Sequence, residues 1–251
     1  MISRRALIGS IGLSGGGLLL SGCDKIAASP IARGVFEGSE KLSYDVSRLV
    51  GSRTALAPEF ALTDVSPVFR SNGTRTPAAA DYTALAAGDF ADWRLAIDGL
   101  VRTPLSLSLA RLMAAPHRTQ ITRHDCVEGW SAIGQWTGTP LGPLLRTAGL
   151  MPQARYIVFH CADDYGAGKY YESIDLLDAF HPQTILAWGL NGRRLPVANG
   201  APLRLRVERQ LGYKQAKYVM RIEAVASLAG IAGGKGGLWE DRGDYAWYAG
   251  I

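Results

Sequence analysis

The chain has 251 residues, of which 47% are hydrophobic and 20% are charged, and its formal net charge at pH 7 is +5. This is an ordinary globular composition, sufficient for one large domain or two small ones. The charge surplus is small and contains no dense run of Lys and Arg, so the sequence gives no case for a nucleic-acid partner.

The first 22 residues have the pattern of an export signal. Arg4 and Arg5 precede a Gly-rich apolar stretch, residues 6–20, which suits the core of a signal peptide and is short for a membrane span. Leu-Ser-Gly then precedes Cys23, as in a bacterial lipobox, where the cysteine sulfur receives a lipid. An arginine pair is typical of the Tat route, which exports folded proteins. We expect residues 1–22 to be a Tat-type lipoprotein signal; an ordinary signal peptide is the alternative.

Cys23 would then anchor the protein to the periplasmic face of a bacterial membrane. Residues 23–60 are expected to form this anchor, a tether and a short helix. Leu42, Val46 and Leu49 fall on one helical face, and Gly51 stands where a C-terminal cap would lie.

Residues 61–251 are expected to form the folded domain, in which strands outnumber helices. Alternating or continuous apolar residues predict strands near 93–97, 156–159, 185–188, 203–207 and 218–225. Short helices are predicted over 109–113 and 140–148, the second capped by Thr139, with Pro140 in its first turn, and ended by Gly149. The pattern predicts an α+β fold with a β-rich mixed-sheet core and short peripheral helices.

Cys126 and Cys161 are the two cysteines of this domain, which is too few for a disulfide scaffold. Cys126 lies in the segment HDCVEGWS, residues 124–131, which is followed by WTGTPL at residues 136–141. A cysteine between strand-like residues and a capped helix suits a reactive thiolate. A structural disulfide with Cys161 is the competing interpretation.

These two segments resemble the cysteine loop of the sulfite-oxidase superfamily, and most closely that of bacterial periplasmic protein-methionine-sulfoxide reductase catalytic subunits. The resemblance covers roughly residues 60–250. It implies the superfamily's molybdopterin-binding fold and a Mo-molybdopterin cofactor, with Cys126 as the ligand to molybdenum. A soft thiolate suits a metal that the pterin's own dithiolene sulfurs already hold.

A second resembling segment runs from residue 195 to residue 204, LPVANGAPLR, and a lysine-bearing loop follows at residues 212–217. Taken alone, Arg204 could be a solvated strand charge and Asn199-Gly200 a hairpin turn. The resemblance instead implies a pocket for the pterin and its phosphate, because the segments follow Cys126 in the family order and a guanidinium fork suits phosphate. The contacts implied here are Asn199, Arg204, Gln215, Ala216 and Lys217.

A third, weaker match at residues 69–73 makes Asn72 a candidate pterin contact. The Tyr-Glu pair that follows in the reductases is replaced by Arg75 and Thr76 here, so the chain departs from the family pattern at these two positions. A pterin-contacting threonine of the reductases falls on Cys161, which is therefore expected to line the pocket.

On the substrate side, His124 beside the cysteine is the candidate catalytic partner of Cys126. Glu128, Trp130, His160 and Asp163 are among the other polar or aromatic candidates. The four histidines lack the paired short spacings of a zinc site. The aromatic residues of the C-terminal tail are expected to serve packing rather than to form a binding platform.

The function predicted from these features is oxo-transfer reduction of a small S-oxide or N-oxide by a molybdopterin-dependent oxidoreductase. The expected partner is a haem- or quinone-linked electron carrier, and the catalytic domain is expected to be monomeric. A sulfite-type oxidase passing electrons to a cytochrome is the alternative within the class. A Cys-dependent hydrolase, activated by His124 or His160, and a non-catalytic lipoprotein are the alternatives from other classes.

Overall fold

The structure is a computed structural model that describes residues 29, 38–39, 42, 44–46, 48, 55–166 and 168–251. The chain divides into two compact units, residues 1–51 and 52–251, and the sheets belong to the second. The described residues between 38 and 48 are helical, as expected there. Cys23, Leu49 and Gly51 lie outside the described residues. Within the described part of the chain, no helix is long and apolar enough to cross a bilayer.

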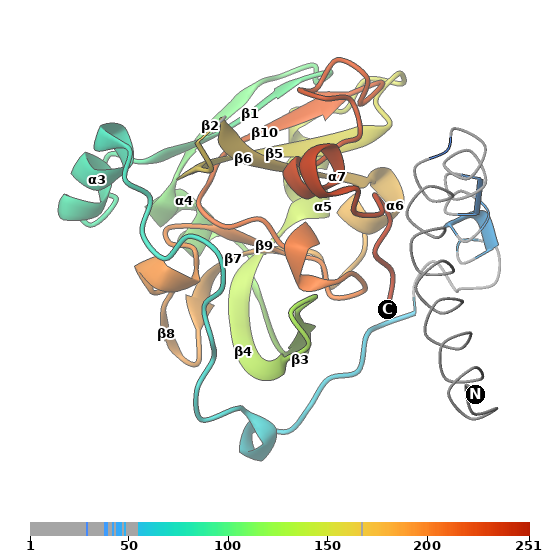
Figure 1. Cartoon of the computed structure of the whole chain (residues 1–251). Coiled ribbons are helices and arrows are strands. Elements are labelled where there is room, and N and C mark those ends of the chain that lie inside the picture. The colour runs from blue at the N-terminus through green and yellow to red at the C-terminus, as the bar shows by residue number, and fades with distance from the viewer. Residues whose placement is uncertain are drawn as a thin grey trace, which may run out of the picture. The chain divides into compact units, whose positions relative to one another are not determined.

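The second unit is built from strands joined by short helices (Figure 1). In chain order, the elements are η1 (Leu62–Asp64), α3 (Ala80–Ala87), β1 (Arg94–Gly99), β2 (Leu105–Ser108), α4 (Leu109–Ala114), β3 (Arg118–Asp125), β4 (Ser131–Pro140), α5 (Leu141–Ala148), β5 (Tyr156–Asp164), β6 (Lys169–Asp175), α6 (Leu176–Ala179), β7 (Ile185–Leu190), β8 (Arg193–Arg194), η2 (Val197–Asn199), β9 (Arg204–Arg206), η3 (Gly212–Lys214), β10 (Val219–Val225) and α7 (Leu238–Gly243).

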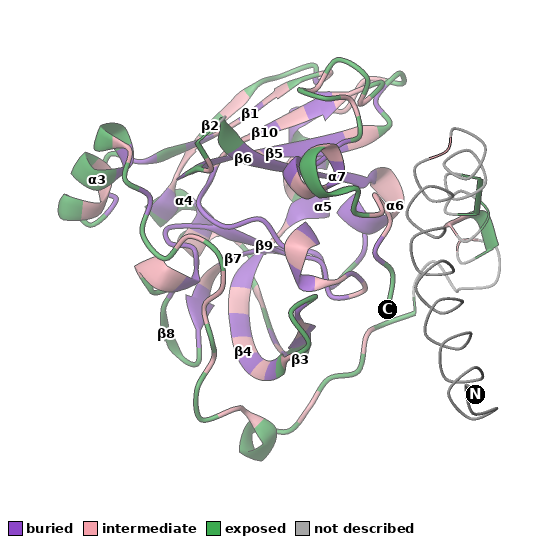
Figure 2. Cartoon of the chain, viewed as in Figure 1, coloured by how far each residue is buried: buried purple, intermediate pink, exposed green. Residues whose placement is uncertain are grey.

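The strands form two sheets. The first has the order β2-β1-β10-β5-β6 and is mixed, because β1 and β10 are parallel while its other pairs are antiparallel. The second has the order β3-β4-β7-β8, and β9 pairs with β7. Buried residues are concentrated on β5, β6, β7 and β9 (Figure 2). The α+β, β-rich fold expected from the sequence is therefore confirmed.

Most of the predicted elements are present. The alternation at residues 93–97 belongs to β1, where Leu95 and Ile97 are buried in the hydrophobic core. The Asn191-Gly192 turn joins β7 to β8 with positive φ angles of 52° and 72°, the conformation of a type I′ hairpin turn. Helix α5 ends at Gly149, whose φ is 70°.

The predicted cap of α5 is wrong. The N-cap residue is Pro140 and makes no side-chain cap bond, while Thr139 belongs to β4. The Thr139 hydroxyl donates to the carbonyl of Leu112 at 2.8 Å. The side chain is buried, and its donor is used to tie β4 to α4 instead.

The long hairpin of β3 and β4 was not predicted as a pair of strands. On β3 the buried side chains are the polar residues Gln120, Thr122 and His124, so its alternation is invisible to a hydrophobicity pattern. The hairpin positions Cys126, which follows the last residue of β3.

Candidate functional site

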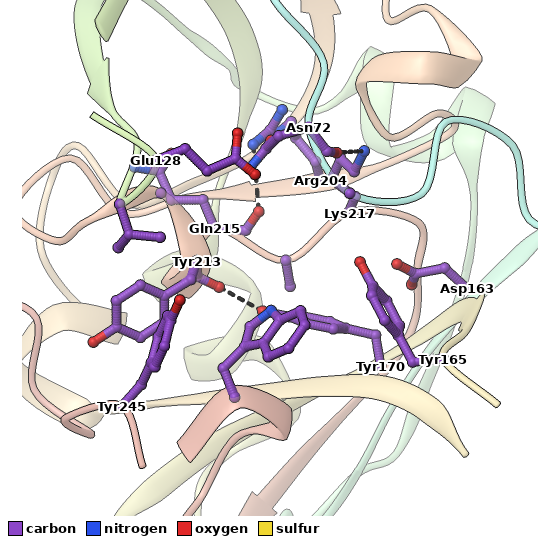
Figure 3. A pocket seen from close by; sticks show the side chains of 15 residues that line it. Asn72, Glu128, Asp163, Tyr165, Tyr170, Arg204, Tyr213, Gln215, Lys217 and Tyr245 are labelled. Carbon is purple, nitrogen blue, oxygen red and sulfur yellow. Dashed lines mark hydrogen bonds between the residues drawn. The ribbon is translucent and has the colours of Figure 1, made fainter. Parts of the chain in front are cut away.

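A cavity of about 200 Å³ lies among residues that were predicted to bind a cofactor (Figure 3). Five parts of the chain line it: the loop before α3, the loop after β3, the β5–β6 hairpin, the segment from β9 to β10, and the C-terminal segment. The predicted residues that line it are Asn72, Arg204, Gln215, Ala216 and Lys217. The fold therefore brings together residues that are up to 145 positions apart in the sequence.

Cys126 lies beside this cavity in a tight loop. Its N–H donates to the Trp130 carbonyl at 2.9 Å, and its carbonyl accepts from the N–H of Gly129, whose φ of 83° favours glycine. The side chain is 6% exposed, and Asn72 Nδ2 lies 3.3 Å from its Sγ. Burial raises the pKa of the thiol despite this donor. A soft cation would have to displace the thiol proton, and the Asn72 amide would stabilise the resulting thiolate.

Arg204 is a buried cation that is 3% exposed. Its guanidinium donates to the carbonyls of Asn199 at 3.0 Å and Gln215 at 3.4 Å, and lies 5.0 Å from the centre of the Trp136 ring. Its Nε has no hydrogen-bond partner among the described residues. Burial, and then the nearby charge of Arg206, lower the pKa of Arg204 to about 9. This site would be stabilised by an anion.

Lys217 is the second buried cation of the cavity. Its Nζ donates to the carbonyls of Asn72 at 2.8 Å and Ala198 at 3.2 Å, and to that of Thr74. These oxygens are neutral, so they do not compensate the charge. Burial, followed by repulsion from Arg204, lowers the pKa of Lys217 to about 7. The two cations together favour a ligand with a phosphate group.

Asn199 and Gly200, which lie next to these two cations, are also suited to binding a phosphate. Asn199 Nδ2 is a buried donor with no partner among the described residues. Gly200 has a φ of 114°, and a Cβ there would lie 3.0 Å from the Cβ of Lys217 and 3.1 Å from that of Arg204. The position therefore requires glycine on two grounds. Free donors, uncompensated cations and a close backbone are what the phosphate of a pterin cofactor needs, so the residues present fit that group.

His124 is placed behind the cavity rather than in its lining. It is 1% exposed, and its Nδ1 accepts a hydrogen bond from Arg206 at 3.0 Å. A Cβ on Gly212 would lie 2.6 Å from its ring, so the imidazole is tightly enclosed. Burial, and then the charge of Arg206, lower the pKa of His124 well below its usual value, which keeps the ring neutral. Its predicted catalytic role stays a prediction, and this position favours a structural role.

Both cysteines of the domain are free thiols, so the alternative of a Cys126–Cys161 disulfide is wrong. Cys161 is 2% exposed and packs in the hydrophobic core. Asp163, two residues along β5, lines the cavity instead. A cofactor contact from Cys161 stays a prediction. Among the described residues, no group of three or more His, Cys, Asp or Glu side chains is placed to hold a metal ion.

An aromatic wall was missed by the sequence analysis. It consists of Tyr165, Tyr213, Trp239 and Tyr245, all of which line the cavity (Figure 3). Trp239 and Tyr245 stack with ring centres 6.0 Å apart, and Tyr165 meets Trp239 edge-on at 5.6 Å. The tail residue Tyr245 stacks on Trp239 and also lines the cavity, so the expectation that the tail aromatics serve packing and form no binding surface is wrong for Tyr245. No local pattern distinguishes a cavity aromatic from a core aromatic.

The helix that carries Trp239 is held by a buried ion cluster. The ammonium of Lys214 on η3 bonds the carboxylates of Glu240 on α7, at 2.7 Å, and of Glu172 on β6, at 2.5 Å. All three side chains have no exposed surface. One cation between two buried carboxylates leaves excess negative charge, and burial raises the pKa of Glu172 well above its usual value. The cluster fixes α7 against both elements and so positions the aromatic wall.

Comparison with known proteins gives concordant matches. Residues 82–229 match the family described as oxidoreductase molybdopterin binding domain. The chain is 44% identical over 162 residues to the putative protein-methionine-sulfoxide reductase subunit YedZ1 of Azospira oryzae, covering 64% of this chain and 57% of that protein. It is 38% identical over 144 residues to the protein-methionine-sulfoxide reductase catalytic subunit MsrP of Ralstonia nicotianae, covering 53% and 44%.

A solved structure shows the same type of fold. The sulfane dehydrogenase SoxCD from Paracoccus pantotrophus matches with a TM-score of 0.51 and 26% identity, over 55% of this chain and 39% of that chain. The chain spans about half the length of the curated relatives it matches. Since the family match covers more than half of the chain, the protein belongs to the oxidoreductase molybdopterin-binding domain family, and its cofactor is a molybdopterin.

Proposed function

We propose that the protein reduces a small S-oxide or N-oxide with electrons from an external carrier. The observation that carries this proposal is the placement of the Cys126 thiol beside a cavity with two buried cations, Arg204 and Lys217, which form no ion pair among the described residues. The direction of the reaction rests on the relatives, which are named as methionine-sulfoxide reductase subunits. When bound, the cofactor supplies a two-electron centre that exchanges an oxygen atom with the substrate.

The roles proposed for the chain's own residues follow from their positions. Cys126 binds the molybdenum through its sulfur, and Asn72 stabilises that sulfur as the thiolate by donating to it. Arg204 and Lys217 hold the cofactor's phosphate, and Asn199 adds its free amide donor. Burial keeps water from these charged contacts, which strengthens each of them.

The aromatic wall is proposed to receive the substituent of the substrate. Its rings offer apolar faces, and thioether sulfur and methyl groups make favourable contacts with aromatic rings. Glu128, whose carboxylate accepts from Trp130 Nε1 at 3.1 Å, lies at the same cavity beside Cys126. The wall therefore favours substrates in which the oxidised atom carries small apolar groups.

The assay provides reduced viologen dye with a panel of S-oxides and N-oxides, and runs sulfite with ferricyanide in parallel. Turnover of an S-oxide or N-oxide supports the proposal. The second candidate function is oxidation of a sulfur compound, which the likeness to a sulfane dehydrogenase favours. Turnover in the sulfite arm alone would establish that direction and contradict ours.

We further propose that the protein is exported by the Tat route and anchored at Cys23 on the periplasmic face of the membrane. The support is the Arg4-Arg5 pair and the small residues before Cys23. A haem- or quinone-linked protein at that membrane would then deliver the electrons. Replacing Arg4 and Arg5 by lysines should block export, because Sec signals tolerate lysine. Unchanged export would contradict the Tat route, and a Cys23→Ala protein that stays on the membrane would contradict the lipid anchor.

A further inference from the structure

The buried ion cluster behind the aromatic wall contains two carboxylate oxygens without a donor. Lys214 Nζ and the N–H of Ser173 both donate to Oε1 of Glu172, at 2.5 and 2.8 Å, and Lys214 also donates to Oε1 of Glu240. The Oε2 atoms of both glutamates are buried and have no hydrogen-bond partner among the described residues. Such oxygens are unfavourable unless a donor reaches them. The cluster therefore lacks a donor at the place where it carries excess negative charge.

The backbone at the start of α7 holds these two carboxylates close together. Gly237 is the N-cap residue of α7. A Cβ added to it would overlap the carboxylate of Glu240 and would lie 2.7 Å from Oε1 of Glu172. Two carboxylates that share one buried site do not both ionise readily, and the pair then retains one proton. That proton would remove the excess charge and supply the missing donor.

The groups around the pair favour retention of a proton. The titratable side chains that act on it from the neighbouring elements, besides Lys214, are the acids Tyr170 and Tyr171 on β6 and Cys161 on β5. On α7, Asp241 is a further acid, and it accepts from the hydroxyl of Tyr171. Burial raises the pKa of Glu172 well above its usual value, despite the attraction of Lys214.

The exposed cations nearest to the pair are bound to other groups. Lys235 forms an ion pair with Asp244 at 2.6 Å, and Arg242 donates to the carbonyl of Tyr165 at 3.1 Å. The ammonium of Lys214 is enclosed by aromatic rings, 5.9 Å from the centre of Tyr213 and 5.2 Å from that of Trp247. Among the described residues, Lys214 is the cation with which both glutamates form their ion pairs.

The cluster is directly connected to the cavity through the chain. Each of its three side chains lies one or two residues from a residue that lines the cavity. These lining residues are Tyr170 on β6, Tyr213 and Gln215 at η3, and Trp239 on α7 (Figure 3). A change in the charge of the cluster is therefore expected to move the aromatic wall.

We propose that Glu172 and Glu240 share one proton, and that this proton must be bound for α7 to hold Trp239 against the cavity. Both are positioning residues, because they act on the site through α7. When the proton leaves, a buried charge remains without a cation, and undocking of α7 returns Glu240 to water. Docked α7 binds one proton more than undocked α7, so a rise in pH favours the undocked form by up to about ten-fold per pH unit.

Hydrogen exchange of α7 tests this inference without a substrate. The full chain with its cofactor is followed by mass spectrometry of a peptide covering residues 237–245, from about pH 6 to about pH 9. After correction for the intrinsic rate, protection in the parent should fall with pH by up to about ten-fold per unit. Glu172→Gln should show constant protection, because its amide donates where the shared proton did. Glu223→Gln, which removes a carboxylate paired with Arg221 on β10, should keep the parental slope.

Glu240→Gln removes the same excess charge and should also show constant protection, so it decides the question if Glu172→Gln does not fold. No slope in the parent, or a parental slope in either glutamine variant, would overturn the inference. Failure of both variants to fold would also overturn it, because an amide would then not replace the proton.

The consequence for substrate binding rests on the proposed function. The KM for an S-oxide, measured per bound pterin so that cofactor loss does not enter, should rise with pH in the parent and stay constant in Glu172→Gln, while kcat changes little. A parental rise of KM in Glu172→Gln would overturn the link between the proton and the wall. If no S-oxide or N-oxide is turned over, the proposed function fails, and the exchange slopes alone decide the inference.

Discussion

Arg204 and Arg206 lie two residues apart on β9, and both guanidinium groups sit over the ring of Trp136, at 5.0 and 4.4 Å from its centre. The two guanidinium groups differ in whether a carboxylate neutralises their charge. Arg206 forms an ion pair with Glu208 in which both side chains have no exposed surface. Arg204 bonds backbone carbonyls, and its Nε is free of partners among the described residues. One arginine is thus compensated by the protein, and the other is left for an anion.

This difference predicts opposite outcomes for two matched substitutions. Arg204→Gln should lose bound pterin, since each charge-assisted contact to phosphate contributes about 1.5–3 kcal/mol, while the free energy of unfolding changes little. Arg206→Gln should lower the free energy of unfolding by about 3–5 kcal/mol, because it leaves the buried Glu208 carboxylate without its cation. Pterin content and urea unfolding measure the two effects. Full pterin content in Arg204→Gln would show that its guanidinium does not hold the phosphate.

Lys217 predicts a pH dependence of cofactor retention. Without an anion its folded-state pKa is about 7, well below the ordinary 10.5. A phosphate stabilises the protonated form, so binding takes up a proton above pH 7. Retention should be strongest below pH 7 and should weaken as the pH rises to about 8.5. Lys217→Arg, which stays charged, should flatten this slope when pterin release is followed from pH 6.5 to 8.5. An equal slope in both proteins would assign the titration to another group.

Whether a residue of the site could be predicted depends on whether it stands in a recognisable sequence motif. Arg204, Gln215 and Lys217 stand in short segments whose resemblance to a known family implied one cofactor site, and all three line the cavity. Asp163 and Trp239 have no motif, and β5 and α7 bring them to the cavity only through tertiary packing. Burial of charge is likewise a tertiary property.

The fold shows the same division. Alternating or continuous apolar residues were sufficient for β1, β7 and β10, because each packs apolar side chains into the core. It failed on β3, where the buried Gln120 donates to Glu208 at 2.8 Å and to the Gln183 carbonyl at 3.0 Å. A strand whose inner face is held by a polar network has no hydrophobic period to detect.

A substitution at Gly212 tests whether His124 has a structural role. A Cβ at this position would lie 2.6 Å from both Cε1 and Nε2 of the imidazole, so Gly212→Ala must displace a ring that is itself bonded to Arg206. We expect the free energy of unfolding to fall by about 1–3 kcal/mol. Gly230→Ala is the control, because nothing lies within 4 Å of its Cβ position. Equal urea midpoints for the two variants would mean that His124 is not held as described.

Replacing Trp239 should change substrate binding without changing the cofactor content. Trp239→Ala removes the ring that stacks on Tyr245 and faces the cavity. The KM for S-oxides with apolar substituents should rise about five- to ten-fold, the equivalent of one lost aromatic contact, while kcat stays near that of the parent. Phe180→Ala, which removes an exposed ring that does not line the cavity, should leave KM unchanged. Loss of pterin in Trp239→Ala would assign the wall to the cofactor instead.

The proposed role of Cys126 as the protein's ligand to molybdenum can be tested by counting the sulfur atoms bound to the metal. X-ray absorption at the molybdenum edge is recorded for the parent, for Cys126→Ser and for Cys161→Ser, each made in a host that supplies the cofactor. The parent and Cys161→Ser should have one sulfur ligand more than Cys126→Ser, whose thermal midpoint should stay close to that of the parent. The same sulfur count in all three proteins, or molybdenum absent from the parent, would contradict it.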